Sequence, residues 1–460
     1  MTTQTIQQFW QQWRGKRVAV CGIGHNNLPV IYQFLDKGVR VLACDRRGRE
    51  ELGETAAELE QRGAELSLGE GYLAHLDVDM ILRTPGMKPY LPEFEQARKR
   101  GIPVTSEMEL FFSLCPAPIY GVTGSDGKTT TTTIIAGLLK AAGKRVHLGG
   151  NIGRSLLPVI EQVDKQDVVV VELSSFQLTG MSQSPHVAVI TNVAPNHLDW
   201  HTDMQEYIDA KRNLMLHQKP GDRVVLNADN EVTASFAGDA AGEVCLFSRR
   251  HGVERGGFLG EDNILYMREG GRDTPVMKRE DILIPGDHNV ENYLAAIAAV
   301  WGQVNPDTIA AYARSFSGVE HRCELVRTRR GVKWYNDSIG SSPSRTIAGL
   351  KAFDRRVILI AGGYDKHIPY DPLGPVAAQK VKAAILMGAT GDKIEQAIRA
   401  CSDLPIVRVA DMQQAVSTAD RMAEEGDIVF MSPASASFDM YRNFMERGDH
   451  FRRLVQALEE

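Results

Sequence analysis

The sequence has no closely spaced cysteines. Its six cysteines stand far apart and form no C-x-x-C pair: Cys21, Cys44, Cys115, Cys245, Cys323 and Cys401. Neither a zinc site nor a disulfide framework has this spacing, which is typical of free thiols in a reducing compartment. The first residues lack a basic region followed by an apolar run, and no window holds eighteen uninterrupted apolar residues. Neither a signal peptide nor a membrane span is therefore predicted, and we expect a cytoplasmic protein.

A surplus of basic residues is also missing. The 52 lysines and arginines are outnumbered by 58 aspartates and glutamates, and the formal net charge is -6. Nucleic-acid-binding domains normally carry a basic stripe or face, so no nucleic-acid partner is expected. Hydrophobic residues make up 43% of the chain and charged residues 24%, which is the balance of an ordinary globular protein. A chain of 460 residues predicts roughly three domains.

Short apolar runs alternate with helical patterns along nearly the whole chain. This alternation predicts an α/β protein with mostly parallel sheets. It falls into three blocks, which predict domains at 1–106, 107–318 and 319–460. A polar, Gly-rich stretch in the second block, residues 238–281, predicts a small antiparallel insertion.

The clearest motif is the segment Gly-Val-Thr-Gly-Ser-Asp-Gly-Lys-Thr-Thr at 121–130. It follows a strand pattern and precedes a helical pattern, so its backbone N–H groups and the positive helix end would face an anion. Lys128 would place its charge on the β- and γ-phosphates, and a following Thr hydroxyl would hold Mg²⁺. The common spacing G-x-x-x-x-G-K-[ST] needs Gly where Val122 stands, so this motif is the shorter T-G-x-x-G-K-T. We expect a nucleoside triphosphate to bind here.

A second glycine turn, at 22–27, follows the first predicted strand. It opens a helix as a dinucleotide-binding turn does, but Asn27 stands where a third Gly is expected. Asp45 ends the next strand, where a ribose-binding acid would sit, and Arg46 and Arg47 follow at once. Two guanidinium groups at the carboxyl end of a strand suit a phosphate or diphosphate. The pattern favours a nucleotide-diphosphate site and leaves an NAD site and a purely structural turn open.

Three polar residues of the second block are candidates for metal and phosphate chemistry. Glu172 ends a buried strand pattern, at the place where P-loop enzymes hold Mg²⁺ directly or through water. His197 follows the next strand pattern and is a candidate second metal ligand or hydrogen-bond donor to a transferring phosphoryl group. Lys211 lies in a helical pattern, where lysines are usually solvated, so composition alone gives it no role.

Polar residues later in the chain suit a nucleoside and its phosphates. Asn289 and Asn292, one helical turn apart, could meet a purine edge, although helix capping explains Asn289 equally well. In the third block Asp337 could accept a ribose hydroxyl, and Arg322 could reach a phosphate. Two further turns present hydroxyl groups and one lysine at strand ends, where α/β domains bind ligands, at 362–366 and 432–438.

Taken in order, these segments resemble the Mur ligase family of peptidoglycan synthesis. The resemblance covers essentially the whole chain and rests on motifs at 123–130, 149–153, 172–177, 196–199, 288–292 and 321–322. Tyr-Asn-Asp-Ser at 335–338, paired with Ser-Pro-Ala-x-Ala-Ser-Phe at 432–438, resembles the member of the family that adds D-glutamate. The resemblance implies an N-terminal Rossmann-like UDP-binding domain, a central P-loop ATPase-like domain with a mostly parallel sheet, and a C-terminal Rossmann-like glutamate-binding domain.

The resemblance also assigns roles to single residues. Binding of the UDP-linked substrate falls to Gly24, His25, Asn26, Arg46, Arg47, Thr84, Gly86 and Asn151. Binding of ATP falls to Gly124, Ser125, Asp126, Gly127, Lys128, Thr129, Thr130, Asn289, Asn292, Arg322 and Asp337. The implied metal ligands are Thr130, Glu172, His197 and Lys211, and the implied glutamate-binding residues are Lys366, Ser437 and Phe438. The implied catalytic residues are Lys128, His197 and Lys211.

The implied activity is the ATP-dependent addition of D-glutamate to UDP-N-acetylmuramoyl-L-alanine (UDP-MurNAc-L-Ala) through an acyl phosphate, by a monomer with two Mg²⁺ ions. Lys211 aligns with the lysine that the family carbamylates, and this change would let it support the second ion. The family's better-known sequences carry Lys where this chain has Ile339 and continue differently at 340–344, so glutamate stereochemistry stays open; Arg345 is a candidate to supply the missing charge.

Two other readings compete with this one. The first is a sister amide ligase, either another Mur member or a folylpolyglutamate synthase. A folylpolyglutamate synthase lacks a UDP-binding domain of the kind that Arg46 and Arg47 indicate. The second is a nucleotide-binding scaffold without turnover. It is disfavoured by the presence of Lys128, Glu172, His197 and Lys211.

Overall fold

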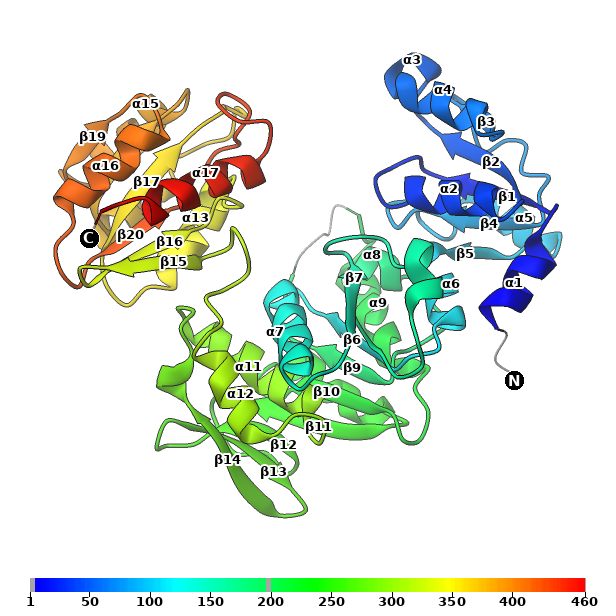
Figure 1. Ribbon diagram of the computed structural model, residues 1–460, viewed down its shortest axis with the longest axis horizontal. Helices are drawn as coiled ribbons and strands as arrows, with labels where there is room; N and C mark the ends of the chain where they lie inside the picture. The colour runs from blue at the N-terminus through cyan, green and yellow to red at the C-terminus, as the bar shows by residue number, and fades with distance from the viewer. Residues whose placement is uncertain (1–4, 196–199, 460) are drawn as a thin grey trace. The chain divides into compact units, whose positions relative to one another are not determined.

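The computed structural model describes residues 5–195 and 200–459 (Figure 1). The chain divides into two compact units: unit 1 is Met1–Met277 with Glu291–Ile309, and unit 2 is Lys278–Val290 with Ala310–Glu460. Two sheets belong to unit 1 and a third to unit 2, and all three are mostly parallel, so the predicted α/β class is confirmed. No helix in the described part of the chain is long and apolar enough to cross a membrane. The exact domain boundaries stay predictions.

The first sheet is parallel and has the strand order β3-β2-β1-β4-β5. Its strands are β1 (Arg17–Cys21), β2 (Arg40–Asp45), β3 (Glu65–Leu68), β4 (Met80–Arg83) and β5 (Val104–Ser106). The helices of this part are α1 (Ile6–Trp13), α2 (Leu28–Asp36), α3 (Arg49–Leu52), α4 (Glu54–Gln61) and α5 (Pro92–Lys99). Alternate residues of β1 enter two different hydrophobic clusters, Val18 and Val20 in one and Ala19 and Cys21 in the other. Both faces of the sheet are therefore covered, as is usual for parallel sheets.

The second sheet has the strand order β14-β13-β12-β11-β10-β9-β6-β8-β7. Its strands are β6 (Ile119–Thr123), β7 (Val146–Gly150), β8 (Val168–Glu172), β9 (Val187–Ile190), β10 (Arg223–Asn227), β11 (Glu243–Ser248), β12 (Gly256–Leu259), β13 (Ile264–Glu269) and β14 (Arg272–Lys278). The helices before β14 are α6 (Glu107–Leu114), α7 (Lys128–Ala141), η1 (Leu157–Gln162), α8 (Ser175–Leu178), α9 (Met204–Leu216), α10 (Glu231–Ser235) and η2 (Phe236–Asp239). Along the chain β14 is followed by η3 (Arg279–Asp281), α11 (Asp287–Val300) and α12 (Pro306–Ala313).

The prediction of a separate antiparallel insertion at 238–281 is wrong in part. β11 pairs in parallel with β10, and β12 pairs in parallel with β11, so both strands extend the main sheet. Only at β13 does the direction reverse. The buried side chains of Cys245 and Phe247 show why: although the stretch is polar overall, β11 still has an apolar face.

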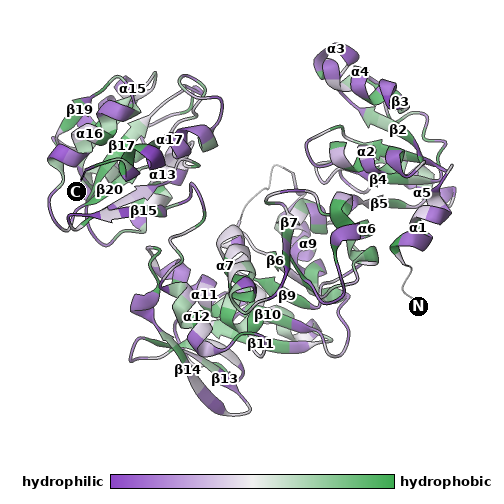
Figure 2. Ribbon diagram, in the orientation of Figure 1, coloured by the Kyte–Doolittle hydropathy of each residue, from purple (hydrophilic) through white to green (hydrophobic). Residues whose placement is uncertain are grey.

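The third sheet, in unit 2, has the strand order β15-β16-β20-β17-β18-β19, with only β15 antiparallel to its neighbour. Its strands are β15 (Glu324–Arg329), β16 (Val332–Asn336), β17 (Val357–Gly362), β18 (Val381–Met387), β19 (Ile406–Arg408) and β20 (Ile428–Met431). Its helices are α13 (Pro343–Lys351), α14 (Leu373–Lys380), α15 (Gly391–Arg399), α16 (Met412–Met422) and α17 (Phe444–Gln456). Figure 2 shows the hydrophobic residues concentrated in the central strands, as expected for strands buried on both faces.

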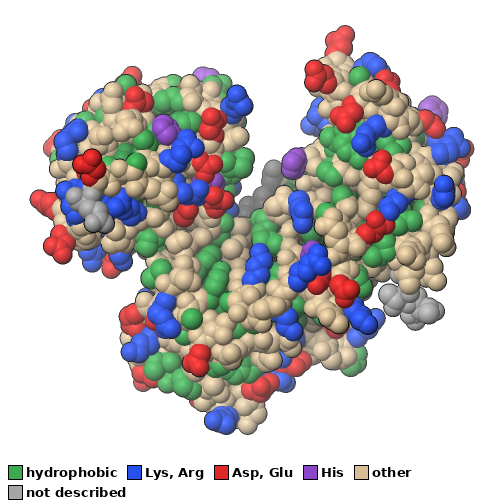
Figure 3. All heavy atoms as spheres, in the orientation of Figure 1, with side chains coloured by type: hydrophobic (Ala, Val, Ile, Leu, Met, Phe, Trp, Pro, Cys, Tyr) green, Lys and Arg blue, Asp and Glu red, His purple; other side chains and the backbone are tan. Residues whose placement is uncertain are grey.

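The strand orders decide where ligands can bind. In each sheet the chain winds first in one direction and then in the other, and the loops at the carboxyl ends of the strands around this reversal form a crevice. In the first sheet these loops follow β1 and β4, in the second β6, β8 and β9, and in the third β16, β17 and β20. On the face drawn in Figure 3, Lys and Arg side chains are interspersed with Asp and Glu over both units, in keeping with the modest net charge.

Candidate active site

The phosphate loop connects β6 to α7, and two of its glycines have no room for a side chain. Gly124 has φ +154°, and a Cβ there would collide with the Thr191 hydroxyl. Gly127, at φ +78°, immediately precedes α7, and a Cβ there would collide with Asn292 Oδ1. Glycine therefore lets the loop pass directly against β9 and α11, and the N-terminus of α7 opens onto the turn, as expected of a phosphate site.

Two lysine ammonium groups meet over this loop. Lys128 Nζ donates to Gly124 O (2.8 Å) and Ser125 O (3.0 Å), and Lys211 Nζ donates to the same Gly124 O (2.9 Å). Lys211 is 1% exposed, and its ammonium lies 4.5 Å from the centre of the Tyr207 ring. Composition alone suggested a solvated helix lysine, and the structure corrects this, because the face of α9 that carries Lys211 packs onto the phosphate loop.

Burial shifts the ionisation of Lys211 strongly. Its pKa is lowered to about 7, first because burial penalises the charged form and then because the Lys128 ammonium repels it. A substantial share of this lysine is therefore a neutral amine near neutral pH, and neutral amines are nucleophiles.

Glu172, at the end of β8, is surrounded by oxygen and amide groups of the same site. It is 2% exposed, its Oε2 accepts from Thr129 Oγ1 (2.7 Å), and its Oε1 accepts from Asn151 Nδ2 (2.7 Å). A carboxylate and a hydroxyl beside a phosphate loop are the hard oxygen ligands that Mg²⁺ prefers, so these residues fit the ion. The hydroxyl next to Glu172 belongs to Thr129, whereas the family resemblance implies Thr130 as a metal ligand. His197, another predicted ligand, lies outside the described residues.

The turn after β1 is organised by Asp45. Asp45 Oδ2 accepts from Ile23 N (2.7 Å), and its oxygens also accept from the backbone and guanidinium of Arg47. These bonds lower the pKa of the Asp45 carboxyl despite its burial. Asn27, in place of a third glycine, donates to Gly22 O (3.1 Å). Asp45 thus holds the turn and Arg47 in place, while Arg46 is exposed beside them.

The predicted substrate loops of the first and second sheets line one cavity in unit 1. Its walls include Asn26, Pro85, Glu107, Gly150 and Gln177. Of the residues predicted for the UDP-linked substrate, Asn26 lines this cavity, and five others are chain neighbours of lining residues: Gly24 and His25 precede Asn26, Thr84 and Gly86 flank Pro85, and Asn151 follows Gly150.

Two buried charged residues that support these loops were missed by the sequence analysis. Arg83 Nη2 donates to Thr179 O (2.5 Å) and its Nη1 to Met87 O (3.0 Å), and burial lowers its pKa to about 10. Glu107 Oε1 accepts from Ser155 Oγ (2.7 Å) and Leu157 N (2.8 Å), and burial raises the pKa of this carboxyl. In both cases the sequence carried a signal, which was a charged residue directly after an apolar run or within one.

The two asparagines of α11 have different partners. Asn292 is 4% exposed, and its Oδ1 accepts from Thr131 Oγ1 (3.1 Å) in α7, so it lies against the helix that begins at the phosphate loop. Asn289 is also buried, and its Nδ2 donates to Pro285 O (2.6 Å). Asn289 lies inside the first turn of α11 rather than at its cap, so the capping interpretation is wrong.

In unit 2 the predicted residues cluster at the carboxyl end of the third sheet. Asp337 Oδ2 accepts from Ser432 Oγ (2.7 Å) and Oδ1 from Cys323 N (3.2 Å), and burial raises the pKa of Asp337 to about 6. The neighbouring Arg322 is half-buried. Arg345 Nη1 donates to Ile339 O (3.3 Å). This guanidinium therefore lies beside position 339, where the family's better-known sequences carry a lysine.

The residues predicted for glutamate differ in exposure. Ser437 is buried, whereas Phe438 is 63% exposed and packs edge-on against Tyr364, with ring centres 5.9 Å apart. Lys366 is exposed on the loop after β17. The structure therefore brings one hydroxyl, one ammonium and an exposed aromatic pair to the same end of the sheet.

A phosphate loop next to a strand-end carboxylate on one parallel sheet defines an enzyme that uses a nucleoside triphosphate. Comparison with protein families narrows this class. The Mur ligase middle domain matches residues 122–300, and the Mur ligase, glutamate ligase domain matches residues 321–435. The chain belongs to the Mur ligase family, whose members depend on ATP.

Individual relatives agree with this assignment. The chain is 51% identical to a UDP-N-acetylmuramoylalanine–D-glutamate ligase of Acetivibrio thermocellus, over 99% of both chains. It is 50% identical to the ligase of the same name from Symbiobacterium thermophilum, over 96% of this chain and 98% of the relative. Among solved structures, the UDP-N-acetylmuramate–alanine ligase of Thermotoga maritima matches with a TM-score of 0.57 and 18% identity, over 96% of this chain and 99% of that one. This last likeness concerns the fold.

Gly127 provides a test of the phosphate loop. We expect Gly127→Ala to lower nucleotide affinity at least about tenfold, because the new Cβ displaces Asn292 and strains a left-handed residue. Gly143→Ala is the matched control: it lies just beyond the other end of α7 at φ +81°, with open space around its Cβ. Titration of both variants with a fluorescent ATP analogue, together with thermal melts, makes the comparison; equal losses in the two variants would contradict the steric argument.

Proposed function

We propose that the protein joins D-glutamate to UDP-MurNAc-L-Ala at the expense of ATP. The observation that carries the proposal is the identity of about half of all positions, over nearly the full length, with relatives named for this reaction. The proposal includes three domains: 1–106 for the UDP-linked substrate, 107–318 for ATP and 319–460 for glutamate. The cytoplasmic location and the monomeric state stay predictions.

The chemistry explains why a phosphate loop is needed. A carboxylate does not condense with an amine in water, because its negative charge repels the nucleophile and oxide is a poor leaving group. In the proposed reaction an oxygen of the alanyl carboxylate attacks the γ-phosphorus of ATP, which gives an acyl phosphate and ADP. The amino group of D-glutamate then attacks the acyl carbon, and the tetrahedral intermediate expels inorganic phosphate and loses a proton. Lys128 and the N–H groups at the start of α7 would stabilise the charge that develops on the phosphoryl oxygens.

Magnesium would be held by Glu172 and Thr129, whose oxygens already lie together. Bound Mg²⁺ would supply neutralisation of the phosphate charge. This replaces Thr130 by Thr129 in the predicted ligand set and leaves Asn151 as the residue that orients the other oxygen of Glu172. A second ion, with His197 and a modified Lys211 among its ligands, is part of the proposal.

The environment of Lys211 supports its carbamylation. The ammonium would first lose a proton; the neutral amine would then attack the carbon of CO₂, form an N–C bond and release a second proton, so that a buried cation is replaced by an anion. The ammonium of Lys128, bonded to the same Gly124 carbonyl, would then attract this group instead of repelling it. A buried carbamate would be a metal ligand of the kind that Glu172 already provides.

Substrate specificity tests the overall proposal. We expect phosphate release from ATP to require both UDP-MurNAc-L-Ala and an amino acid, and to be at least about a hundredfold faster with D-glutamate than with L-glutamate. A coupled phosphate assay and mass spectrometry of the product make the measurement. Stimulation of phosphate release by a different amino acid would favour a sister ligase. Phosphate release that depends on neither substrate would contradict a ligase.

Paired threonine variants test the metal site. We expect Thr129→Ala to raise the Mg²⁺ concentration for half-maximal activity about tenfold, because it removes the hydroxyl beside Glu172. Thr130→Ala should raise it by no more than about twofold. Mg²⁺ titrations at saturating ATP distinguish the two; the reverse order of effects would restore Thr130 as the ligand.

The pH dependence of carbamylation tests Lys211. With a pKa of about 7, roughly nine-tenths of the amine is neutral at pH 8 and roughly one-tenth at pH 6, so carbamylation and activity should fall together as pH is lowered. Lys211→Met should abolish the carbamate signal in ¹³C NMR with labelled bicarbonate and lower activity at least about a hundredfold. Lys140→Met, at an exposed lysine near the end of α7, is the control. A carbamate signal that persists in Lys211→Met would assign the modification elsewhere.

A further inference from the structure

Arg447, in the first turns of α17, is a buried arginine that the proposed reaction does not use. It is 1% exposed and is among the largest fully buried side chains in the described residues. Burial lowers its pKa to about 10. Its hydrogen bonds all go to a hydroxyl or to backbone carbonyls, and no carboxylate of the described residues forms an ion pair with it. Burying a guanidinium without a carboxylate in contact is costly, and Asp439 and Asp337 offset this only through longer-range attraction, so this arrangement requires an explanation.

The guanidinium joins two loops at the carboxyl end of the third sheet. Its Nε donates to Ser338 Oγ (3.0 Å) and its Nη2 to Ser338 O (2.9 Å), on the loop after β16. Its Nη1 donates to Ser435 O (3.1 Å) and Ala436 O (3.0 Å), on the loop after β20. β16 and β20 are neighbouring strands, so a single side chain sets the separation of the loops that extend from them.

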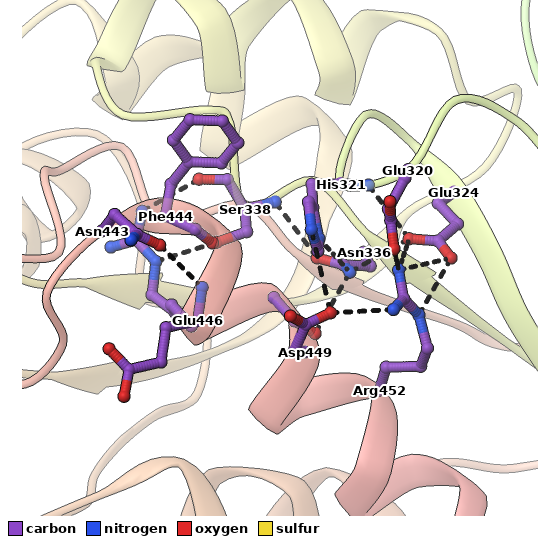
Figure 4. A network of polar contacts seen from close by, with 12 residues as sticks. Glu320, His321, Glu324, Asn336, Ser338, Asn443, Phe444, Glu446, Asp449 and Arg452 are labelled. Atoms are coloured by element: carbon purple, nitrogen blue, oxygen red, sulfur yellow. Dashed lines mark hydrogen bonds and ion pairs between the residues drawn. The ribbon is translucent and has the colours of Figure 1, made fainter. Parts of the chain in front are cut away.

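A third loop is fitted against the same carbonyl group. Tyr364 N donates to Ala436 O (2.9 Å), and a Cβ at Gly363 would collide with this oxygen and approach Arg447 Nη1 to 3.2 Å. The loop after β17, which carries Lys366, therefore depends on the position of Ala436. Ser338 Oγ in turn donates to Phe444 O (2.7 Å), which closes the arrangement onto the start of α17 (Figure 4).

A second arginine of α17, Arg452, lies in a contrasting environment. Arg452 forms ion pairs with Glu320 (2.8 Å), Glu324 (3.0 Å) and Asp449 (2.8 Å), and it is partly exposed (Figure 4). Its charge is balanced by carboxylates, and it fills the space between Glu320 and Asp449, where these two acids and His321 could otherwise suggest a metal site. Within the described part of the chain, Arg447 has no carboxylate in contact with it: Asp439 and Asp337 act on its charge without forming an ion pair, and its hydrogen bonds go to the loops.

We propose that Arg447 is a positioning residue for D-glutamate: it fixes the loops that carry Ser437, Phe438 and Lys366 and leaves a positive charge beneath an anionic substrate. This inference rests on the proposed function. Because the side chain is buried, it acts through the loops and does not touch the substrate. The planar fork of arginine is required, since the ammonium of a lysine cannot reach two sides of Ser338 and two successive carbonyls at once.

The conservative variant Arg447→Lys tests the proposal, because it keeps the charge and loses the fork. We expect the KM for D-glutamate to rise at least about tenfold, with the KM values for ATP and UDP-MurNAc-L-Ala within about twofold of wild type and kcat lowered less than the KM is raised. Arg453→Lys, at the exposed arginine six residues along the same helix, should match wild type in all constants. A thermal melt of each variant reports folding.

Ser338→Ala gives an independent measurement if Arg447→Lys does not fold. It removes the acceptor of Arg447 Nε and the bond from Ser338 Oγ to Phe444 O but keeps the bond from Arg447 Nη2 to Ser338 O, so we expect a smaller rise in the same constant, about threefold. An unchanged KM for D-glutamate in a folded Arg447→Lys, or an equal rise in all three KM values, would overturn the proposal. Wild-type protein is measured first: failure of D-glutamate to stimulate it would refute the proposed function, whereas an active wild type with insensitive variants would refute only the positioning role.

Discussion

Two ammonium groups share one carbonyl oxygen, that of Gly124, and the central site depends on this constraint. The loop reaches this position because Gly124 adopts a backbone conformation that L side chains rarely adopt and because no Cβ keeps it away from Thr191. Burial, together with the proximity of the Lys128 charge, lowers the pKa of Lys211, and in the proposed carbamylation this would make the amine reactive toward CO₂. The same closeness explains how a carbamate would be stabilised, since repulsion between two cations would become attraction. Structure and chemistry are thus linked at a single backbone atom.

Polar groups are buried around the other loops for a similar reason. Asp45 holds the turn after β1, Glu107 holds the chain near Asn151, and Arg447 holds the loops after β16 and β20. Each is buried and spends its hydrogen bonds on backbone or neighbouring side chains, which keeps a binding loop in one conformation. Several of the residues proposed to touch substrates, among them Arg46, Lys366 and Phe438, are exposed on those loops. Buried side chains that fix the loops, combined with exposed side chains on the same loops, are the arrangement expected for sites at the carboxyl ends of parallel strands.

Much of the fold could be predicted because buried parallel strands have continuous apolar sequences. The run 17–21 coincides with β1, and the run ending at Glu172 with β8. The predictions were wrong where a local pattern was ambiguous: β11 appeared to belong to a separate insertion because the surrounding stretch is polar. The resemblance implied Thr130 as a metal ligand, and that role stays a prediction; a run of threonines does not reveal which hydroxyl lies beside Glu172, and the structure places that of Thr129 there. Arg83 and Arg447 were overlooked, since a lone arginine in a sequence is usually solvated.

The sequence by itself determined the α/β class, the phosphate loop and, through family resemblance, the reaction to propose. These depend on short-range spacing, which is visible along the chain. Only the tertiary structure decided which distant residues meet, because burial and hydrogen bonding depend on packing between elements. Lys211 lies 87 residues from Gly124 and Arg447 lies 109 residues from Ser338, yet each pair is joined by a hydrogen bond. The pKa of a lysine and the need for an arginine's fork arise from such contacts, where water is excluded and charges must find partners in the protein.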